Sequence, residues 1–261
     1  MSSTVKCRVC GENTNFLWDN KLLGKYVVKY YQCPKCQYVM TEEPYWIEEA
    51  YSKSINLSDT GYLVRNLLLS NFVSILLFLT YSKASSFLDF AGGYGVFVRL
   101  MRDKGFNFYW IDKYTTNLFA VNFEWKEGKH VEAITAFEVF EHLVTPKEEI
   151  AELFKSAKTL IISTDLYQDK APGKNWEYLG FDHGQHIGFY NKKTLAYVAS
   201  QHNMRVYSYG GIHVFTRDER LSNFKFYLSK LLFKFKFHHL LKRFLESKTL
   251  SDSHQIKKES V

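Results

Sequence analysis

The sequence predicts an α/β protein in which a doubly wound sheet follows a small cysteine-rich module. Between residues 85 and 203, short apolar runs alternate with amphipathic stretches, as in parallel strands joined by crossover helices. A glycine pair at 210–211 separates two further strand-like runs and predicts a two-residue hairpin, so the sheet should end in an antiparallel pair. All four cysteines lie in the first 36 residues, ahead of this alternation.

The cysteine module, residues 1–40, follows the pattern C-x2-C-x22-C-x2-C. Two C-x2-C turns supply four thiolates at tetrahedral angles, which predicts a zinc ribbon with the ligands Cys7, Cys10, Cys33 and Cys36. Four sulfur ligands leave no open coordination position, so this zinc is expected to be structural. The alternatives to a zinc site are that the cysteines cluster by chance or that two of them form a redox pair. The first residues, MSSTVKCRVCGENT, contain no apolar signal core, which predicts a reducing, cytoplasmic location.

Two segments connect this module to the alternating region. Residues 41–60 are expected to form a linker with a short acidic and aromatic helix. Residues 61–81 predict a long helix that approaches membrane-span length. Arg65, Asn66 and Asn71 interrupt its apolar run and would be costly in lipid, so a helix buried against a sheet is the favoured interpretation.

The alternating region then predicts four strands and four helices before the hairpin. The strands are expected at 85–90, 106–112, 131–139 and 158–167, and the helices at 96–105, 115–120, 146–157 and 191–203. The hairpin occupies 205–217.

The first of these strands runs into a glycine-rich bend, LDFAGGYG, at residues 88–95. Ligands of an open α/β sheet bind at the carboxyl ends of its strands, and glycines let the backbone approach a ligand closely. A dinucleotide site needs a third small residue, but Val98 stands there, so a ligand without a pyrophosphate, such as S-adenosylmethionine, fits better. Asp112 ends the next strand and is placed to hold ribose hydroxyls. A plain strand–turn–helix corner is the alternative.

A second group of polar residues follows the third strand. The stretch EVFEHLVTP contains Glu138, Glu141 and His142 at the carboxyl end of that strand, where they would face the ligand crevice. The alternative is a solvated turn ahead of the helix that begins at Pro146.

Taken in order, LDFAGGYG and EVFEHL..P resemble the class I S-adenosylmethionine-dependent methyltransferases, over residues 58–217. The resemblance implies a Rossmann-like seven-stranded sheet with an antiparallel last hairpin, in a domain of residues 61–218. The candidate donor-binding residues are Asp89, Ala91, Gly92, Gly93, Tyr94, Gly95, Asp112 and Glu138, together with Tyr62 and Arg65 near the donor carboxylate. Ala91 stands where the family's loop has its first glycine. This departure is what favours the rival interpretation, a non-catalytic zinc-ribbon binding module.

A zinc module ahead of such a domain resembles some sugar methyltransferases, in which the Glu-His pair faces the acceptor. Those of the C-methylating type carry a further domain, so O-methylation of a sugar, nucleotide sugar or glycan in polysaccharide synthesis is expected here. His142 is the predicted base and Glu141 its orienting partner, with His183 and His186 in reserve. No ligand cluster for a catalytic Mg²⁺ is recognisable in the sequence. A quinone, a lipid or tRNA is the alternative acceptor.

The segment that follows the fifth strand, residues 175–195, is rich in aromatic side chains that could stack on a sugar ring. They are Trp176, Tyr178, Phe181 and Tyr190. The motif GQHIGFY within this segment resembles methyltransferases of polysaccharide gene clusters. The alternative is that the segment simply packs onto the sheet.

The last forty residues differ in composition from the rest of the chain. Residues 219–248 predict a basic amphipathic helical tail, and residues 249–261 are expected to be disordered. The tail suits an anionic membrane surface, at the inner face of the membrane, and docking onto the domain is the alternative. The net charge of +7 is modest and is not spread over the ribbon, which argues against a nucleic-acid partner.

Overall fold

The computed structural model describes residues 5–51, 59–126 and 128–259. The chain forms two compact units, which are described one at a time. Unit 1 comprises Met1–Asn56, Phe137–Lys155 and Ile162–Phe215, and unit 2 comprises Leu57–Ala136, Ser156–Ile161 and Thr216–Val261.

The main sheet has six strands in the order β5-β4-β6-β7-β10-β9. Their bounds are β4 Ser86–Phe90, β5 Asn107–Ile111, β6 Ala133–Phe137, β7 Thr159–Ser163, β9 Arg205–Tyr209 and β10 Ile212–Thr216. β4 pairs in parallel with β5 and with β6. Only two residues join β9 to β10, so these neighbours run antiparallel. The predicted α/β class with a terminal hairpin is therefore confirmed.

The family's seventh strand is reduced to one isolated parallel bridge, between Trp110 of β5 and Glu124. The backbone of Trp110 accepts from Trp125 and donates to Phe123, and no further strand pairing follows among the described residues of this segment. The sequence after Trp125 reads KEGKH and offers no run of alternating apolar side chains, which a further strand would need.

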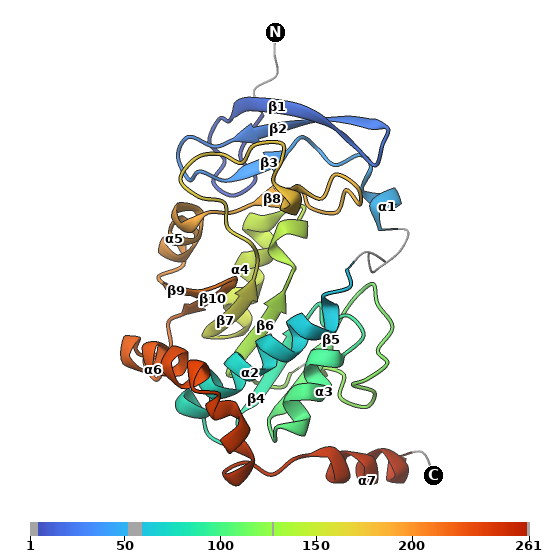
Figure 1. Cartoon of the computed structure of the whole chain (residues 1–261), viewed down its shortest axis with the longest axis vertical. Helices are drawn as coiled ribbons and strands as arrows, with labels where there is room; N and C mark the ends of the chain where they lie inside the picture. Colours follow the sequence, from blue (N-terminus) through green and yellow to red (C-terminus); the bar gives the residue numbers. More distant parts are fainter. Residues whose placement is uncertain (1–4, 52–58, 127, 260–261) are drawn as a thin grey trace. The chain divides into compact units, whose positions relative to one another are not determined.

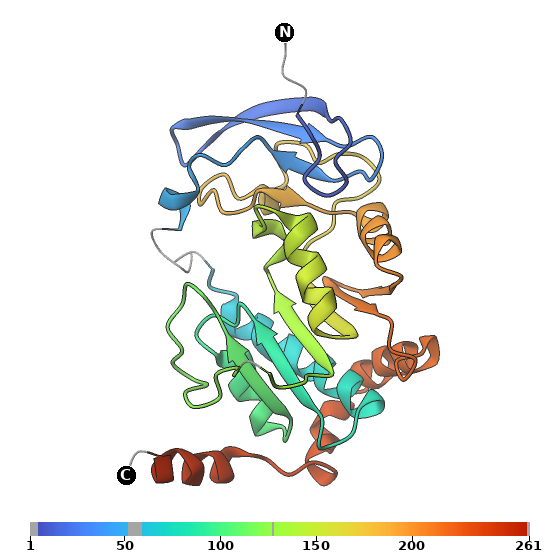
Figure 2. The ribbon, with the colours of Figure 1, turned by 180° about the vertical axis from the view of Figure 1, so that it is seen from behind.

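In unit 2, the long helix α2 (Tyr62–Thr80) packs against α3 (Val96–Asp103) and α6 (Asn223–Lys234). Figures 1 and 2 show α2 and α3 on the same face of β4 and β5. Among the described residues, α2 is the one helix whose length and composition would allow it to cross a membrane, and 56% of its apolar window is buried inside the protein. The predicted helix at 61–81 is therefore present, with its buried side turned largely toward other helices.

The expected helix at 115–120 is absent. The side chain of Asn117 accepts a hydrogen bond from the backbone N–H of Ala120 at 2.9 Å and donates to Glu124 at 2.6 Å. An asparagine side chain that binds the local backbone in this way favours a bend over a helical turn, which explains the error.

The basic tail is not one continuous helix. It consists of α6 and a 3-10 segment, η3 (Phe237–Arg243), separated at Lys236, whose φ of 55° lies in the left-handed region. Helical geometry cannot pass through a residue in that conformation, so the chain changes direction there.

The last segment also departs from the expectation of disorder, because Thr249–Glu259 forms helix α7; residues 260–261 lie outside the described chain. The Arg102 guanidinium donates to both oxygens of Asp252, at 2.7 and 2.6 Å, and both side chains are buried. The composition of the segment is that of a solvated chain, and it cannot reveal a buried partner 150 residues away.

Unit 1 contains a four-stranded sheet in the order β1-β2-β3-β8. Its strands are β1 Asn15–Leu22, β2 Tyr26–Gln32, β3 Val39–Thr41 and β8 Gly188–Phe189 (Figure 1). The helices of unit 1 are α1 Ile47–Ala50, η1 Phe140–His142, α4 Pro146–Ser156, η2 Glu177–Leu179 and α5 Lys192–Gln201. The short helix expected in the linker is therefore present as α1, while residues 52–58 of that linker lie outside the described chain.

The cysteine module, expected as a separate unit at 1–40, shares its sheet and its core with a later part of the chain. β3 pairs with β8 in the register Val39↔Phe189 and Met40↔Gly188. A Cβ at Gly188 would lie 1.8 Å from the Tyr38 hydroxyl, so only glycine fits there. The common core includes Leu22, Val28 and Tyr30 from the module and Leu179, Ile187 and Phe189 from the later segment.

Candidate active site

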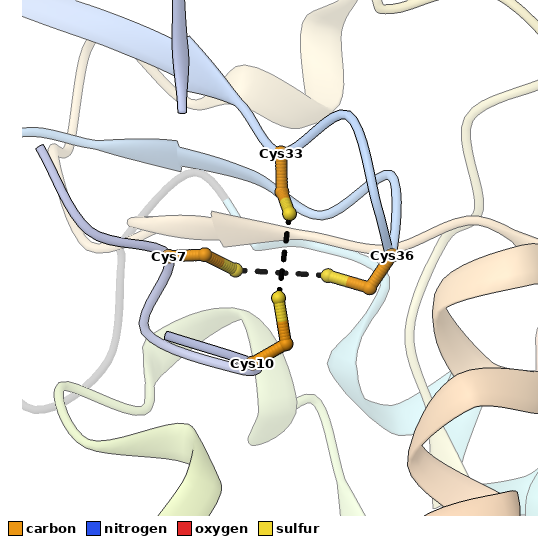
Figure 3. A group of neighbouring side chains, drawn as sticks. All are labelled: Cys7, Cys10, Cys33 and Cys36. Atoms are coloured by element: carbon orange, nitrogen blue, oxygen red, sulfur yellow. Dashed lines mark hydrogen bonds between the residues drawn. The ribbon is translucent and has the colours of Figure 1, made fainter. Parts of the chain in front are cut away.

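The four cysteines converge as the sequence predicted. Figure 3 shows their sulfur atoms pointing toward a common centre, and all four lie within 4.8 Å of one another. Sγ of Cys7 is 3.6 Å from Sγ of Cys36, and Sγ of Cys10 is 3.4 Å from Sγ of Cys33. Sulfur atoms around a tetrahedral zinc lie about 3.8 Å apart, so the donor set and its spacing fit that ion.

The glycine bend follows β4, in unit 2, and leads into α3. A Cβ at Gly92 would lie 2.7 Å from Asp89 Oδ2 and 2.8 Å from the Trp110 ring. Gly95 has a φ of 84°, and a Cβ there would lie 2.9 Å from Ala120. The bend therefore tolerates no side chain at either position, and its backbone runs directly over the ends of β4 and β5.

Ala91 occupies the left-handed region as well, with a φ of 54°. The position therefore requires the conformation for which glycine is suited, and the alanine Cβ makes that conformation costly, by about 1–2 kcal/mol. The sequence showed that the family's glycine is replaced, but not that this position has a positive φ.

Replacing Ala91 with glycine is expected to raise the free energy of unfolding by about 0.5–1 kcal/mol, because relief of the strain exceeds the added entropy of the unfolded chain. Chemical denaturation would measure it. The matched control is Ala151→Gly inside α4, where the same change should destabilise by about 1 kcal/mol. A loss of stability in Ala91→Gly would contradict the strain.

Asp112 follows β5, and its carboxylate accepts hydrogen bonds from three backbone N–H groups. Oδ2 accepts from Gly93 at 2.9 Å, and Oδ1 accepts from Tyr114 at 2.7 Å and Thr115 at 2.8 Å. The residue predicted to hold ribose hydroxyls therefore also anchors the glycine bend to the end of β5. Sequence reasoning missed this second role, which arises from the pairing of β4 with β5.

Replacing Asp112 with alanine is expected to weaken binding of S-adenosylhomocysteine by at least about tenfold, because each lost hydrogen bond to a charged group contributes about 1.5–3 kcal/mol. Isothermal titration calorimetry would measure it. Asp182→Ala, at an exposed acid of unit 1, is the control and should leave the affinity unchanged. Equal affinities for the Asp112→Ala variant and the wild type would exclude Asp112 from donor binding.

Asp89 is buried at the end of β4 and accepts from the Thr135 hydroxyl at 2.5 Å. Burial, with a smaller contribution from the Asp112 carboxylate, raises the pKa of Asp89 to about 7. Tyr62 lies beside the bend, since its hydroxyl is 3.2 Å from the place a Cβ would take on Gly93. Arg65 forms a two-pronged ion pair with Asp59, at 3.1 and 2.6 Å, so its guanidinium already has a carboxylate partner within unit 2.

On the predicted acceptor side, in unit 1, the structure brings Glu141, His142 and His186 together; we call these three residues the acceptor cluster. One possible ligand atom from each lies within 4.8 Å of the others. Glu141 is fully buried, and its Oε1 accepts from the Tyr178 hydroxyl at 2.6 Å. Burial raises the pKa of Glu141 to about 7, opposed by the Tyr178 and Thr164 hydroxyls. Burial also lowers the pKa of His142, which favours its neutral imidazole.

Two imidazoles and a carboxylate make the acceptor cluster a possible metal-binding group in addition to the four cysteines. The expectation from the sequence concerned only a Mg²⁺ ligand set and did not include this group. All three residues are acceptor-side candidates from the sequence, but no spacing shows that they converge, because His186 is far along the chain from Glu141 and follows a different strand. His183, the other reserve base, lies beside the cluster, with its ring centroid 4.7 Å from that of His186. It is not one of the three converging groups, and its Nδ1 accepts from the Gln185 N–H at 3.1 Å.

Glu138, a predicted donor ligand, begins the same motif with a φ of 51°. Its Oε1 accepts from the Ser163 hydroxyl at 2.5 Å, and its N–H donates to the Ser163 carbonyl at 3.1 Å. The side chain and backbone of Glu138 are thus joined to the end of β7.

The aromatic side chains of 175–195 mostly belong to the core of unit 1 and do not form a free stacking surface. Phe181 packs edge-on against Trp18 and Tyr30, and Trp176 packs against Phe189. Tyr190 is fully buried. The structure favours the alternative, in which the segment packs onto a sheet, because β8 joins the ribbon sheet and this long-range pairing gives these rings apolar partners. Tyr178 is the exception, since its hydroxyl reaches the acceptor cluster.

A family model described as a methyltransferase domain matches residues 65–209, which is more than half of the chain. The chain belongs to the methyltransferase domain family. The protein is an S-adenosylmethionine-dependent methyltransferase. The glycine bend with Asp89 and Asp112 is the donor motif that the sequence predicts for it. A search of curated proteins found no match.

Solved structures similar to this chain include three methyltransferases. The plantazolicin methyltransferase BpumL in complex with SAH has 12% identity and a TM-score of 0.48, and the match covers 67% of this chain and 95% of that one. CalO1, a methyltransferase in calicheamicin biosynthesis, in its SAH-bound form, has 11% identity and a TM-score of 0.43, with 66% and 61% covered. Magnesium protoporphyrin IX methyltransferase from Synechocystis PCC 6803 with bound SAM has 12% identity and a TM-score of 0.37, with 67% and 95% covered.

Proposed function

We propose that this methyltransferase O-methylates a hydroxyl of a sugar, nucleotide sugar or glycan during polysaccharide synthesis. The acceptor cluster is the observation that carries the proposal. It combines a buried carboxylate with two imidazoles, the groups that proteins use to take a proton from a hydroxyl or to lower its pKa. A transfer to oxygen needs such a group, because a neutral hydroxyl is a weak nucleophile toward a methyl sulfonium.

The proposed roles divide between the two units. In unit 2, the glycine bend, Asp89 and Asp112 bind the donor, with Tyr62 beside the bend. In unit 1, the acceptor hydroxyl is deprotonated at the acceptor cluster, where Nε2 of His142 is the basic atom because Nδ1 lies 3.0 Å from the Gln185 carbonyl and carries the proton. The Gln185 carbonyl orients this imidazole, and the Tyr178 hydroxyl holds the Glu141 carboxylate beside it.

The test begins with calorimetric titration of the zinc-loaded protein with S-adenosylhomocysteine, where we expect one site of micromolar affinity. Transfer of a labelled methyl group to panels of nucleotide sugars, glycans, quinones, lipids and tRNA then identifies the acceptor. A methylated sugar hydroxyl is the expected product. Transfer to a quinone, a lipid or tRNA alone would overturn the sugar proposal and leave the enzyme class intact. Absence of donor binding in the folded protein would instead favour the binding-module interpretation.

We further propose that the protein acts at an anionic membrane surface, where lipid-linked glycans are built. Phe224, Tyr227 and Leu231 on α6, and Phe235 directly after it, recur every three to four residues, and all are exposed. Residues 223–245 contain six lysines and arginines and no acid, so their charge complements anionic lipid. A cytoplasmic location agrees with this proposal, since cysteine-bound zinc requires reduced thiols.

Sedimentation with vesicles tests the membrane proposal. Vesicles with anionic lipid should bind the protein, and neutral vesicles should not. Phe224→Ser combined with Phe235→Ser should abolish binding, whereas Phe16→Ser on exposed β1 of unit 1 should not. Equal binding by both variants would show that this face is not the contact.

A further inference from the structure

Glu141 has a buried oxygen that lacks a partner. The Glu141 side chain is fully buried. Its Oε1 accepts a hydrogen bond from the Tyr178 hydroxyl, whereas its Oε2 forms none among the described residues. An unpartnered buried polar atom costs about 1–3 kcal/mol, and more when the group is charged. The fold therefore leaves a buried carboxylate oxygen that a bound ligand would satisfy.

The two imidazoles of the acceptor cluster are held in the same tautomer. Nδ1 of His142 lies 3.0 Å from the Gln185 carbonyl, and Nδ1 of His186 lies 2.5 Å from the Tyr178 carbonyl. A carbonyl can only accept, so each Nδ1 carries the proton and each Nε2 carries a lone pair. Imidazoles that bind metals are oriented in this way, with the second nitrogen donating to a carbonyl or carboxylate.

We propose that Glu141, His142 and His186 bind one divalent transition-metal ion, separate from the four-cysteine zinc. One ring nitrogen of each histidine and a carboxylate oxygen already lie within 4.8 Å of one another, and donors around such an ion lie about 3–3.5 Å apart, so side-chain rotations would close the site. Two imidazoles favour Mn²⁺, Fe²⁺, Co²⁺ or Zn²⁺ over Mg²⁺. Three protein ligands leave positions open, as in catalytic sites and unlike the ribbon.

This inference rests on the proposed function for its consequence, since the open positions would take the acceptor hydroxyl. The ion would lower the pKa of that hydroxyl, and His142 would then hold the ion and not the substrate proton. The O–H bond breaks and its proton passes to solvent. The oxygen forms a bond to the methyl carbon, and the electron pair of the broken C–S bond returns to sulfur, which leaves neutral S-adenosylhomocysteine. Tyr178, bound to the other oxygen of Glu141, would be an outer-shell group that orients the ligand.

The test is titration of the full-length, zinc-loaded protein with Mn²⁺. Electron paramagnetic resonance measures the concentration of free Mn²⁺ at each step. One Mn²⁺ site per chain is expected beside the zinc. Glu141→Gln preserves the bulk and the contact with Tyr178, and His186→Ala removes one imidazole; each should weaken Mn²⁺ binding by at least about tenfold. His183→Ala is the matched control, because this imidazole is next to His186 but is not part of the cluster.

Affinity lost in Glu141→Gln and His186→Ala but kept in His183→Ala would support the site. No Mn²⁺ or Co²⁺ binding beyond the ribbon at millimolar concentration, or binding that none of these changes weakens, would overturn it. Zinc content and near-ultraviolet circular dichroism, measured on the same samples, report whether unit 1 of each variant is folded. Because Mn²⁺ binding is measured without an acceptor, failure of the sugar proposal leaves this result unaffected, and the reverse also holds.

Discussion

Replacing His142 with asparagine is expected to lower kcat by about 100- to 10,000-fold while leaving the affinity for S-adenosylhomocysteine within about twofold. The asparagine amide can still donate to the Gln185 carbonyl, which Nδ1 of His142 contacts at 3.0 Å, so local structure should persist. The change removes Nε2, the atom proposed to accept the substrate proton or, with a metal ion bound, to coordinate that ion. The donor motif lies in unit 2 and contains none of the atoms changed.

The measurement combines single-turnover methyl transfer to the acceptor found by screening with calorimetry on the same preparations. His183→Asn is the control, because it removes a neighbouring imidazole from the same segment, and its kcat should stay within about threefold of the wild type. Full turnover in His142→Asn, or a large loss in His183→Asn, would transfer the role to the other histidine.

Replacing Cys33 with serine is expected to abolish the structural zinc and unfold much of unit 1. Zinc bound by such a module contributes about 10–16 kcal/mol of apparent binding free energy, as much as the whole stability of a typical domain. The ribbon strands share their core with Leu179, Ile187 and Phe189, so the loss should extend to the segment that carries the acceptor cluster. A chelator applied to the wild type should have the same effect, reversed by added zinc.

Elemental analysis gives the zinc content, and near-ultraviolet circular dichroism follows the stacked rings of Trp18 and Tyr30, whose centroids are 4.1 Å apart. Lys35→Ala, an exposed position in the same C-x2-C turn, serves as the control and should retain zinc and stability. One zinc per chain and an unchanged melting temperature in Cys33→Ser would show that the four sulfurs do not act as one site.

The features predicted from sequence depend on contacts between residues close in the chain. The two C-x2-C turns, the bend at Gly92, Gly93 and Gly95, and the strand–helix alternation are all local patterns of this kind, and the structure contains each of them. Their physical causes, metal-ligand spacing, backbone freedom and side-chain periodicity, act over a few residues, so a single sequence displays them.

Other features were decided only by tertiary structure, because their partners are remote. The pairing of β3 with β8 gives most of the aromatic side chains that could have stacked on a sugar apolar partners in unit 1, with Tyr178 as the exception. The buried ion pair between Arg102 and Asp252 holds α7 in place, although the composition of this segment predicted disorder. His186 joined Glu141 and His142 in one cluster although no sequence spacing connects them. Composition and periodicity specify what each residue can do, whereas long-range packing decides which residues meet, and here that packing assembled the acceptor cluster.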